Sequence, residues 1–406
     1  MKVILAALWL VTLVAAYGVG QFANTGSKTA SVASLESFRS ALGEKDPIER
    51  SYGFSAFVRS MTEDQLPEAV EAFEAGRAWL SQEELRLFML AWARYDAAGA
   101  FERVDARTEG NGEMARGAAI YAWAFYDPSA ALEALNGVEN RFAQKRLRTD
   151  LVNGWSASAY KWELGEWIAT LPESDAKQRY TGTLARALLR DGPEELIAWV
   201  EAVPAQPDVN FKNLAVLKAM NALAHKHCLR AVKWIDEHRD QEYAQNAGPI
   251  VVRHWSRDDP KAALFWGLEL ADPKHRDRAV DYSFRPWLER EPEVAEAWLR
   301  AEAPSTALDP AVGIMVRETM ASSFEGAMEW AEKIEDPKKK EANILDLALR
   351  WRGRDSEAAD AWLAGADVSD EMRQRILEGP RAAGGRRDAG RPPPLRRRRG
   401  EAAEAP

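Results

Sequence analysis

Three arginines recur at a constant interval in the second half of the sequence. Arg253, Arg285 and Arg317 follow one another at a step of 32. In a protein built from repeats of that length, equal phase places them in a line on one face. A guanidinium can bind a carboxylate or phosphate through two hydrogen bonds, so the spacing predicts a binding stripe for an acidic peptide, a phosphate or a carboxylated glycan. The alternative, which the acidic composition favours, is that each arginine pairs with an Asp or Glu of the adjacent repeat.

A cluster of metal-type ligands lies between these arginines and the first half of the chain. His225, His227 and Cys228 are nearly consecutive, and His238 follows further along. On one helix, residues 225 and 228 share a face whereas residue 227 points elsewhere. Zinc sites need ligands that converge from two elements, and the sequence offers no second pair. We therefore interpret the cluster as a polar surface and expect neither metal nor cofactor.

Motifs for catalysis are missing from the sequence. It contains no G-x-S-x-G, P-loop or H-E-x-x-H pattern, which would mark a nucleophile, a phosphate site or a zinc-binding helix. Carboxylate pairs such as Asp258-Asp259 are abundant, but one member of each suits a helix cap. We assign no catalytic residue and expect a protein that is not an enzyme.

Tryptophans form two ladders that reveal an internal repeat. Neighbours within a ladder mostly follow one another at a step of 31 or 32, and a three-residue insertion separates Trp199 from Trp234. Constant phase on amphipathic helices predicts that the indoles fill the core, although a stacking platform for sugars or peptides is the alternative. The ladders consist of Trp123, Trp155, Trp255, Trp287 and Trp351, preceded by Trp92, and of Trp167, Trp199, Trp234, Trp266, Trp298, Trp330 and Trp362.

Acidic residues between the two ladders mark the start of a helix. Asp127 and Asp259 each precede a proline, and Asp355 holds the same place in its repeat. An Asp side chain accepts the free N–H groups of a first helical turn, and Pro is well tolerated at the first helical position. We therefore expect these three residues to be helix N-caps. The predicted repeat consists of helix, tight turn, helix and tight turn within one step of the ladders.

The repeat defines an expected fold class. No segment alternates with the period of two that is typical of strands, so we expect an all-α protein, an α-solenoid of antiparallel helix pairs. The unit resembles tetratricopeptide-type repeats, in which a small Ala precedes an aromatic residue by four positions, as Ala262 precedes Trp266 and Ala358 precedes Trp362. The step of 32 departs from the usual 34 of that family. The resemblance implies a right-handed superhelix that serves as a platform for partner proteins.

The ends of the chain differ from the repeats. Residues 3–22 are uncharged and reach the length of about 20 residues that spans a bilayer, so residues 1–23 are predicted to be a transmembrane or signal-anchor helix, with a cleaved signal or a buried helix as alternatives. Residues 24–34 read as a linker, residues 35–378 as the solenoid, and residues 379–406 as a disordered Arg- and Pro-rich tail or a reading-frame artefact.

Charge and topology complete the functional expectation. The net charge is −9, and the tail is basic, so the body is strongly acidic. An acidic body argues against nucleic-acid binding. Lys2 favours a cytoplasmic N-terminus, which would place the solenoid on the exported, periplasmic side of the inner membrane. We expect a noncatalytic scaffold for an unknown protein or peptide partner. The alternatives are a cell-envelope enzyme or accessory domain acting on cell-wall glycan, and a cytosolic adaptor.

Overall fold

The structure is a computed structural model, and it describes residues 34–76, 80–104, 111–205 and 211–379. These residues form helices joined by short connections, and no strand occurs among them. The expectation of an all-α protein is therefore confirmed. The chain divides into two compact units, with the boundary between Ala222 and Leu223, and each unit is described by itself.

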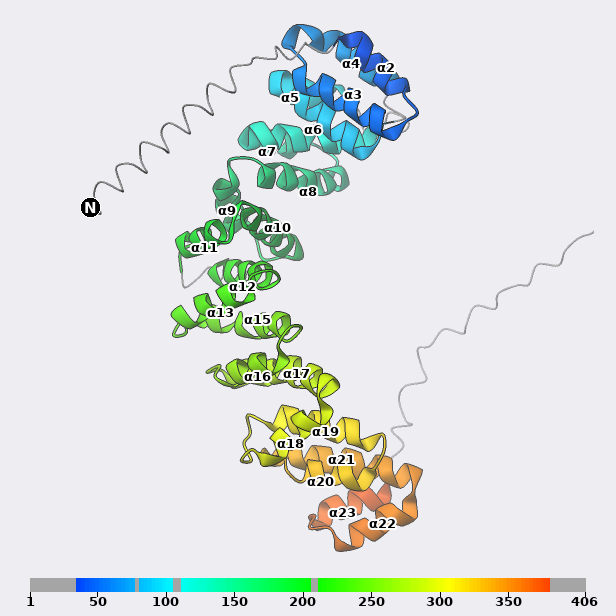
Figure 1. Cartoon of the computed structure of the whole chain (residues 1–406), viewed down its shortest axis with the longest axis vertical. Helices are drawn as coiled ribbons and strands as arrows, with labels where there is room; N and C mark the ends of the chain where they lie inside the picture. The colour runs from blue at the N-terminus through cyan, green and yellow to red at the C-terminus, as the bar shows by residue number, and fades with distance from the viewer. Residues whose placement is uncertain (1–33, 77–79, 105–110, 206–210, 380–406) are drawn as a thin grey trace, which may run out of the picture. The chain divides into compact units, whose positions relative to one another are not determined.

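Unit 1 contains the helices of the N-terminal half (Figure 1). The helices are α2 (Leu35–Gly43), α3 (Pro47–Ser60), the 3-10 helix η1 (Glu63–Gln65), α4 (Leu66–Gly76), α5 (Gln82–Arg103), α6 (Gly112–Tyr126), α7 (Pro128–Asn136), α8 (Arg141–Ala157), α9 (Lys161–Thr170), α10 (Asp175–Asp191), α11 (Pro193–Ala202) and α12 (Phe211–Ala224), whose last two residues belong to unit 2. From α5 to α11 each helix packs against the next, and α8 also packs against α6 and α10. Before them, α2 packs against α3 and α4, and α3 packs against α5.

Unit 2 continues the pattern of short paired helices. The helices are α13 (Cys228–Glu237), α14 (Glu242–Gln245), α15 (Gly248–Trp255), α16 (Pro260–Leu268), α17 (Pro273–Arg290), α18 (Pro292–Ala301), α19 (Asp309–Met320), α20 (Phe324–Ala331), α21 (Pro337–Arg354), α22 (Ser356–Gly365) and α23 (Asp370–Glu378). Here α13 packs against α15, α15 against α17 and α17 against α19. The helices α16, α18 and α20 each pack against the helix before and the helix after them, and α21 packs against α22 and α23.

Acidic side chains start several of these helices. The carboxylate of Asp127 accepts a hydrogen bond from the N–H of Ala130 at the start of α7, at 3.0 Å. Asp259 and Asp355 do the same at the starts of α16 and α22, at 2.9 and 3.0 Å. A fourth such position, Asp96, lies at a kink inside α5, where its backbone is not helical. In the pairs with Asp127, Asp259 and Asp355, an acidic N-cap therefore marks where the second helix begins.

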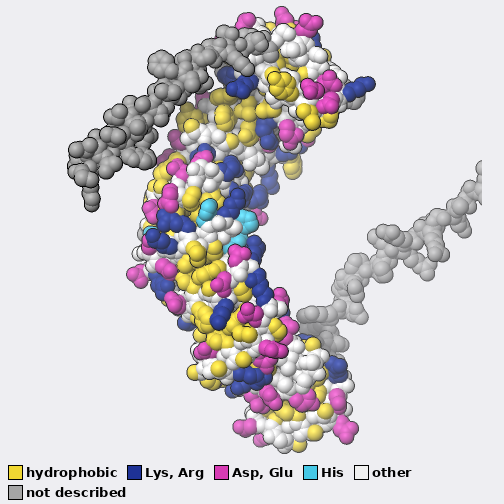
Figure 2. Space-filling model, viewed as in Figure 1, with side chains coloured by type: hydrophobic (Ala, Val, Ile, Leu, Met, Phe, Trp, Pro, Cys, Tyr) yellow, Lys and Arg dark blue, Asp and Glu magenta, His cyan; other side chains and the backbone are white. Residues whose placement is uncertain are grey.

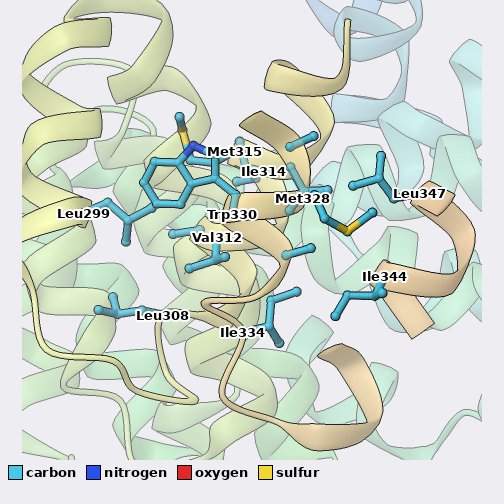
Figure 3. Close-up of a cluster of buried hydrophobic side chains, with 14 of the residues drawn as sticks. Leu299, Leu308, Val312, Ile314, Met315, Met328, Trp330, Ile334, Ile344 and Leu347 are labelled. Atoms are coloured by element: carbon cyan, nitrogen blue, oxygen red, sulfur yellow. The ribbon is translucent and has the colours of Figure 1, made fainter. Parts of the chain in front are cut away.

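Apolar side chains of α16 to α23 form one continuous core in unit 2. Trp330 is almost fully buried among Val312 and Met315 of α19 and Leu299 of α18. Ile344 and Leu347 of α21 extend the same cluster (Figure 3). Each helix contributes one apolar face to a core that it shares with the helices before and after it, as the period of about 3.6 residues in its sequence requires.

The expected membrane segment lies outside the residues that the structure describes. Residues 1–33 and 380–406 lie outside the described residues, and they include the predicted anchor, all but Ser34 of the predicted linker, and nearly all of the predicted tail. Within the described residues, no helix has both the length and the apolar character that a membrane span requires.

Candidate functional site

The two tryptophan ladders meet inside the helix pairs. The ring centroids of Trp155 and Trp167 lie 5.7 Å apart, and those of Trp351 and Trp362 lie 6.0 Å apart. Trp255 and Trp266 are separated by 6.4 Å. Aromatic pairs at such distances stabilise a core beyond the burial of their surface. The short, nearly constant interval between the two ladders in the sequence therefore corresponds to one indole on each helix of a pair.

The indoles of the ladders are unequally buried. Within the described residues, none of the twelve ladder positions from Trp123 onward is exposed. Seven are buried, namely Trp155, Trp199, Trp234, Trp266, Trp287, Trp330 and Trp351; five are half-buried, namely Trp123, Trp167, Trp255, Trp298 and Trp362. This distribution supports the core interpretation and gives little support to a stacking platform along the ladders.

Polar side chains link elements that lie about one repeat apart. Trp266 donates its indole N–H to Asp236 at 3.0 Å, across 30 residues of sequence. Trp162 donates to Glu195 at 2.8 Å across 33 residues, and Arg50 to Glu84 at 2.7 Å across 34. These separations match the length of the sequence repeat, so each such contact joins one helix pair to the next.

Of the three arginines in the predicted stripe, Arg285 has an acidic partner. Arg285 forms an ion pair with Glu318 at 2.5 Å, and these residues lie 33 positions apart. Arg317 is exposed and close to Asp281, where burial raises the pKa of the carboxyl and the charge of Arg317 opposes that shift. Arg253 is exposed as well and also has a partner. The pairing alternative therefore describes Arg285 better than a free binding stripe does.

The structure forms a groove between α8 and α10 that the repeat pattern did not predict. It has a volume of about 550 Å³, within the range of ligand pockets. We call it the α8–α10 groove; its lining comprises Phe142, Gln144, Lys145, Arg146, Arg148 and Thr149 of α8, Leu171, Pro172 and Ser174 of the α9–α10 turn, and Ala176, Arg179 and Tyr180 of α10. Basic side chains are visible on this part of unit 1 in Figure 2.

The lining of the α8–α10 groove is basic in an otherwise acidic protein. It holds four cationic side chains and no acidic one. Arg146 pairs with Glu113, whereas within the described residues no ion pair joins Lys145, Arg148 or Arg179 to an acid. The Nε of Arg148 is buried and has no hydrogen-bond partner among those residues. The groove therefore presents a local excess of positive charge.

An aromatic side chain stands at the edge of this groove. Phe142 is 89% exposed, the highest exposure of any large apolar side chain in the described residues. It belongs to α8, whose N-cap Asn140 accepts the N–H groups of Phe142 and Ala143. The signal in the sequence was the run RFAQKRLR, residues 141–148, which combines one aromatic residue with a cluster of bases.

A second hollow in unit 1 is mainly apolar. It measures about 370 Å³ and is lined by Trp162, Trp199, Phe211 and Val203, with Glu166 as its acidic side chain. Trp162 is 39% exposed. Because Trp162 lies outside the two ladders, sequence periodicity did not single it out.

His225 and Cys228 of the histidine and cysteine cluster contact residues of α15. The rings of His225 and His254 lie 5.7 Å apart. The thiol of Cys228 lies 3.9 Å from the backbone oxygen of Val251, and burial together with the charge of Asp258 raises its pKa to about 11. Such a thiol is a poor metal ligand because ligation requires the thiolate. No group of three potential ligands converges anywhere in the described residues.

Comparison with known proteins gives no family assignment. No family model matches this chain, and no curated protein or solved structure matches it either.

Proposed function

We propose that this chain is a noncatalytic helical-repeat scaffold that binds a partner protein. In this proposal the paired helices form an α-solenoid with a right-handed superhelix, as the resemblance to tetratricopeptide-type repeats implies. Support comes from the packing of neighbouring helices and from polar contacts that recur about one repeat apart in the sequence. Repeats that contact only their neighbours create long surfaces suited to binding other chains.

The observation that carries the proposal is the α8–α10 groove with Phe142 at its edge. A phenyl ring that is 89% exposed gains little stability from its position in the fold. Exposed aromatic residues beside basic ones are typical of protein interfaces, where aromatic residues and Arg are enriched. The groove and the exposed ring beside it therefore support a role in binding.

The location of the scaffold is part of the same proposal. We infer that residues 1–23 anchor the chain in the inner membrane and that the helical part lies on the periplasmic side. The uncharged run that follows Lys2 supports this inference. Protease protection in spheroplasts would test it, since an exported helical part is degraded by external protease whereas a cytosolic one is protected.

Site-specific photocrosslinking in cells tests the binding role. A benzophenone amino acid is placed at Phe142, and in a separate strain at Tyr52, which is 75% exposed on α3. We expect Phe142 to give a discrete crosslinked band with one protein and Tyr52 to give none. The two positions are aromatic and exposed, so Tyr52 is a matched control for random encounters.

Two results would contradict the proposal. Equal crosslinking from both positions would mean that Phe142 reports collisions only. The absence of any protein adduct at Phe142, with the chain expressed and folded, would remove the observation on which the binding role rests.

A second candidate function rests on the apolar hollow beside Trp162. An exposed indole near a carboxylate is an arrangement that stacks on a sugar ring and bonds its hydroxyl groups. A role on cell-wall glycan would use this hollow. Binding of muropeptides that is lost in Trp162→Ala and retained in Phe142→Ala would favour it over the scaffold.

A further inference from the structure

We infer that the α8–α10 groove binds an acidic peptide segment that carries an apolar side chain. This inference rests on the proposed function and specifies the chemistry of its partner. It combines two features of one surface, the uncompensated bases of the groove and the exposed ring of Phe142. Neither feature stabilises the fold in an evident way, and together they define a ligand.

The charge of the groove selects an anionic ligand. Lys145 and Arg179 are exposed, and Arg148 lies half-buried between the two helices. Guanidinium groups bind carboxylates with shorter and stronger hydrogen bonds than neutral donors do. Because Arg146 is already paired with Glu113, three cationic side chains remain for the ligand. A peptide with two or three carboxylates in a short stretch would match them.

The start of α10, at the other wall of the groove, adds to the positive potential. Ser174 caps α10, and the first turn of that helix lines the groove at Ala176. The N-terminus of a helix carries a partial positive charge. Two acidic residues stand beside this turn, Glu173 and Asp175, but Glu173 is bound to Lys177 at 2.9 Å. The local balance therefore remains positive.

Phe142 is the reason to expect an apolar side chain in the ligand. Its ring projects from α8 near the start of the helix, and Tyr180 and Leu171 provide a partly apolar wall within the groove. Burying an exposed phenyl ring against an apolar side chain of the partner is favourable because it removes apolar surface from water. A ligand composed of charge alone would leave this ring in water.

Nucleic acid fits the surface less well. Proteins that bind single-stranded DNA or RNA stack successive bases on a series of aromatic side chains. Of the two aromatic rings that line the α8–α10 groove, Phe142 is exposed, whereas Tyr180 is buried against Trp167. The acidic remainder of the chain would also repel a long polyanion. The short acidic peptide is therefore the better match, and nucleic acid becomes an outcome of the test.

Selection from a random peptide library tests the inference. Short random peptides displayed on phage are panned against the full-length chain in detergent, and in parallel against Lys145→Glu/Arg179→Glu. A second double variant, Arg39→Glu/Arg59→Glu, is the control. It reverses two exposed bases of α2 and α3 that do not line the groove, so the two variants have equal net charge. Circular dichroism verifies that both remain folded.

We expect the wild type and the control to enrich peptides that contain several Asp or Glu and one large apolar residue. The Lys145→Glu/Arg179→Glu variant should lose this enrichment. For a synthetic enriched peptide followed by fluorescence polarisation, it should bind at least about tenfold more weakly, because two charge-assisted contacts become repulsive. Phe142→Ala should weaken binding about threefold to tenfold, because the partner's apolar side chain loses its contact.

Three results would overturn the inference. The first is a set of selected peptides with no excess of acidic residues over the input library. The second is an equal loss of binding in both double variants, which would indicate long-range attraction rather than a site. The third is tighter binding of a short oligothymidylate than of any enriched peptide. If crosslinking at Phe142 still captured one protein, the proposed function would stand while this inference failed.

Discussion

The indole rings of Trp287 and Trp298 lie with their centroids 5.3 Å apart and their planes inclined by 48°. Trp287 is the last buried residue of α17, and only 1% of its own surface is exposed. Its indole N–H donates a hydrogen bond to Glu291 at 3.0 Å. Trp298 lies on α18 and is half-buried. This contact joins a residue of the first ladder to a residue of the second.

Replacement of Trp287 by alanine is expected to destabilise unit 2 by about 3–5 kcal/mol, since it opens a cavity of indole size in a packed core. Trp298→Ala should cost clearly less because part of that ring already contacts water. Urea unfolding followed by far-UV circular dichroism measures both values. Equal effects of the two substitutions, or no effect of Trp287→Ala, would contradict the assignment of Trp287 to the core.

The regular part of this fold could be predicted from the sequence. Constant phase of Trp255, Trp287 and Trp351 identifies the first helix of each pair, and the acidic residue four positions later marks where the second begins. Both signals are local, because an apolar stripe and an N-cap act within one or two turns of a helix. These local signals are therefore sufficient to predict the helix pairs.

The α8–α10 groove could not be predicted in the same way. It depends on which side chains of α8 and α10 face each other across the turn at Pro172, and no periodicity encodes that relation. Phe142 is outside both ladders, and the bases beside it look in sequence like any solvated helix face. The sequence likewise could not identify Glu318 as the partner of Arg285, because the two residues lie on different helices.

The cap at Asp259 leads to a second prediction. Asp259→Ala should lower the free energy of unfolding by about 1 kcal/mol, the usual effect of losing an N-cap, because the N–H of Ala262 loses its acceptor. Asp258→Ala removes the same charge from the neighbouring exposed residue and should change stability by less than about 0.5 kcal/mol. The same unfolding measurement compares them. A larger loss for Asp258→Ala would contradict the role of Asp259 as the cap.

A third prediction concerns Lys212, whose ammonium group satisfies the end of the preceding helix. Its Nζ donates to the backbone oxygens of Val200 at 2.6 Å and Val203 at 2.9 Å. Lys177 makes the equivalent contacts with the end of α9, to Leu171 at 2.8 Å and Ala169 at 3.3 Å. Both residues therefore close the carbonyl end of a helix with a buried cation.

Lys212→Met is expected to destabilise unit 1 by about 1–3 kcal/mol, because it leaves buried carbonyl oxygens without a donor. Lys218→Met on the same helix serves as control, since its side chain only approaches Gln178 at 3.5 Å. Thermal unfolding of the two variants gives the comparison. If Lys212→Met were as stable as the wild type, the carbonyl groups would have found water and the capping role would be excluded.

The last prediction concerns pH and His254. Burial, followed by the positive charges of Arg257 and Arg253 and by His225, lowers the pKa of His254 below its usual value. In the unfolded chain this histidine titrates near its ordinary pKa of about 6.5. As the pH falls below that value, His254 of the unfolded state takes up a proton before His254 of the folded state does. The free energy of unfolding therefore decreases progressively until the pH reaches the lower pKa of the folded state.

His254→Gln should therefore flatten the decline in melting temperature between pH 7.5 and pH 5.5, because the substituted side chain takes up no proton in either state. His227→Gln is the matched control, since His227 is exposed on the connection before α13 and makes no capping hydrogen bond with its side chain. Circular dichroism melts of the three proteins at both pH values give the measurement. A decline in His254→Gln as steep as in the wild type would show that other groups control the acid sensitivity of unit 2.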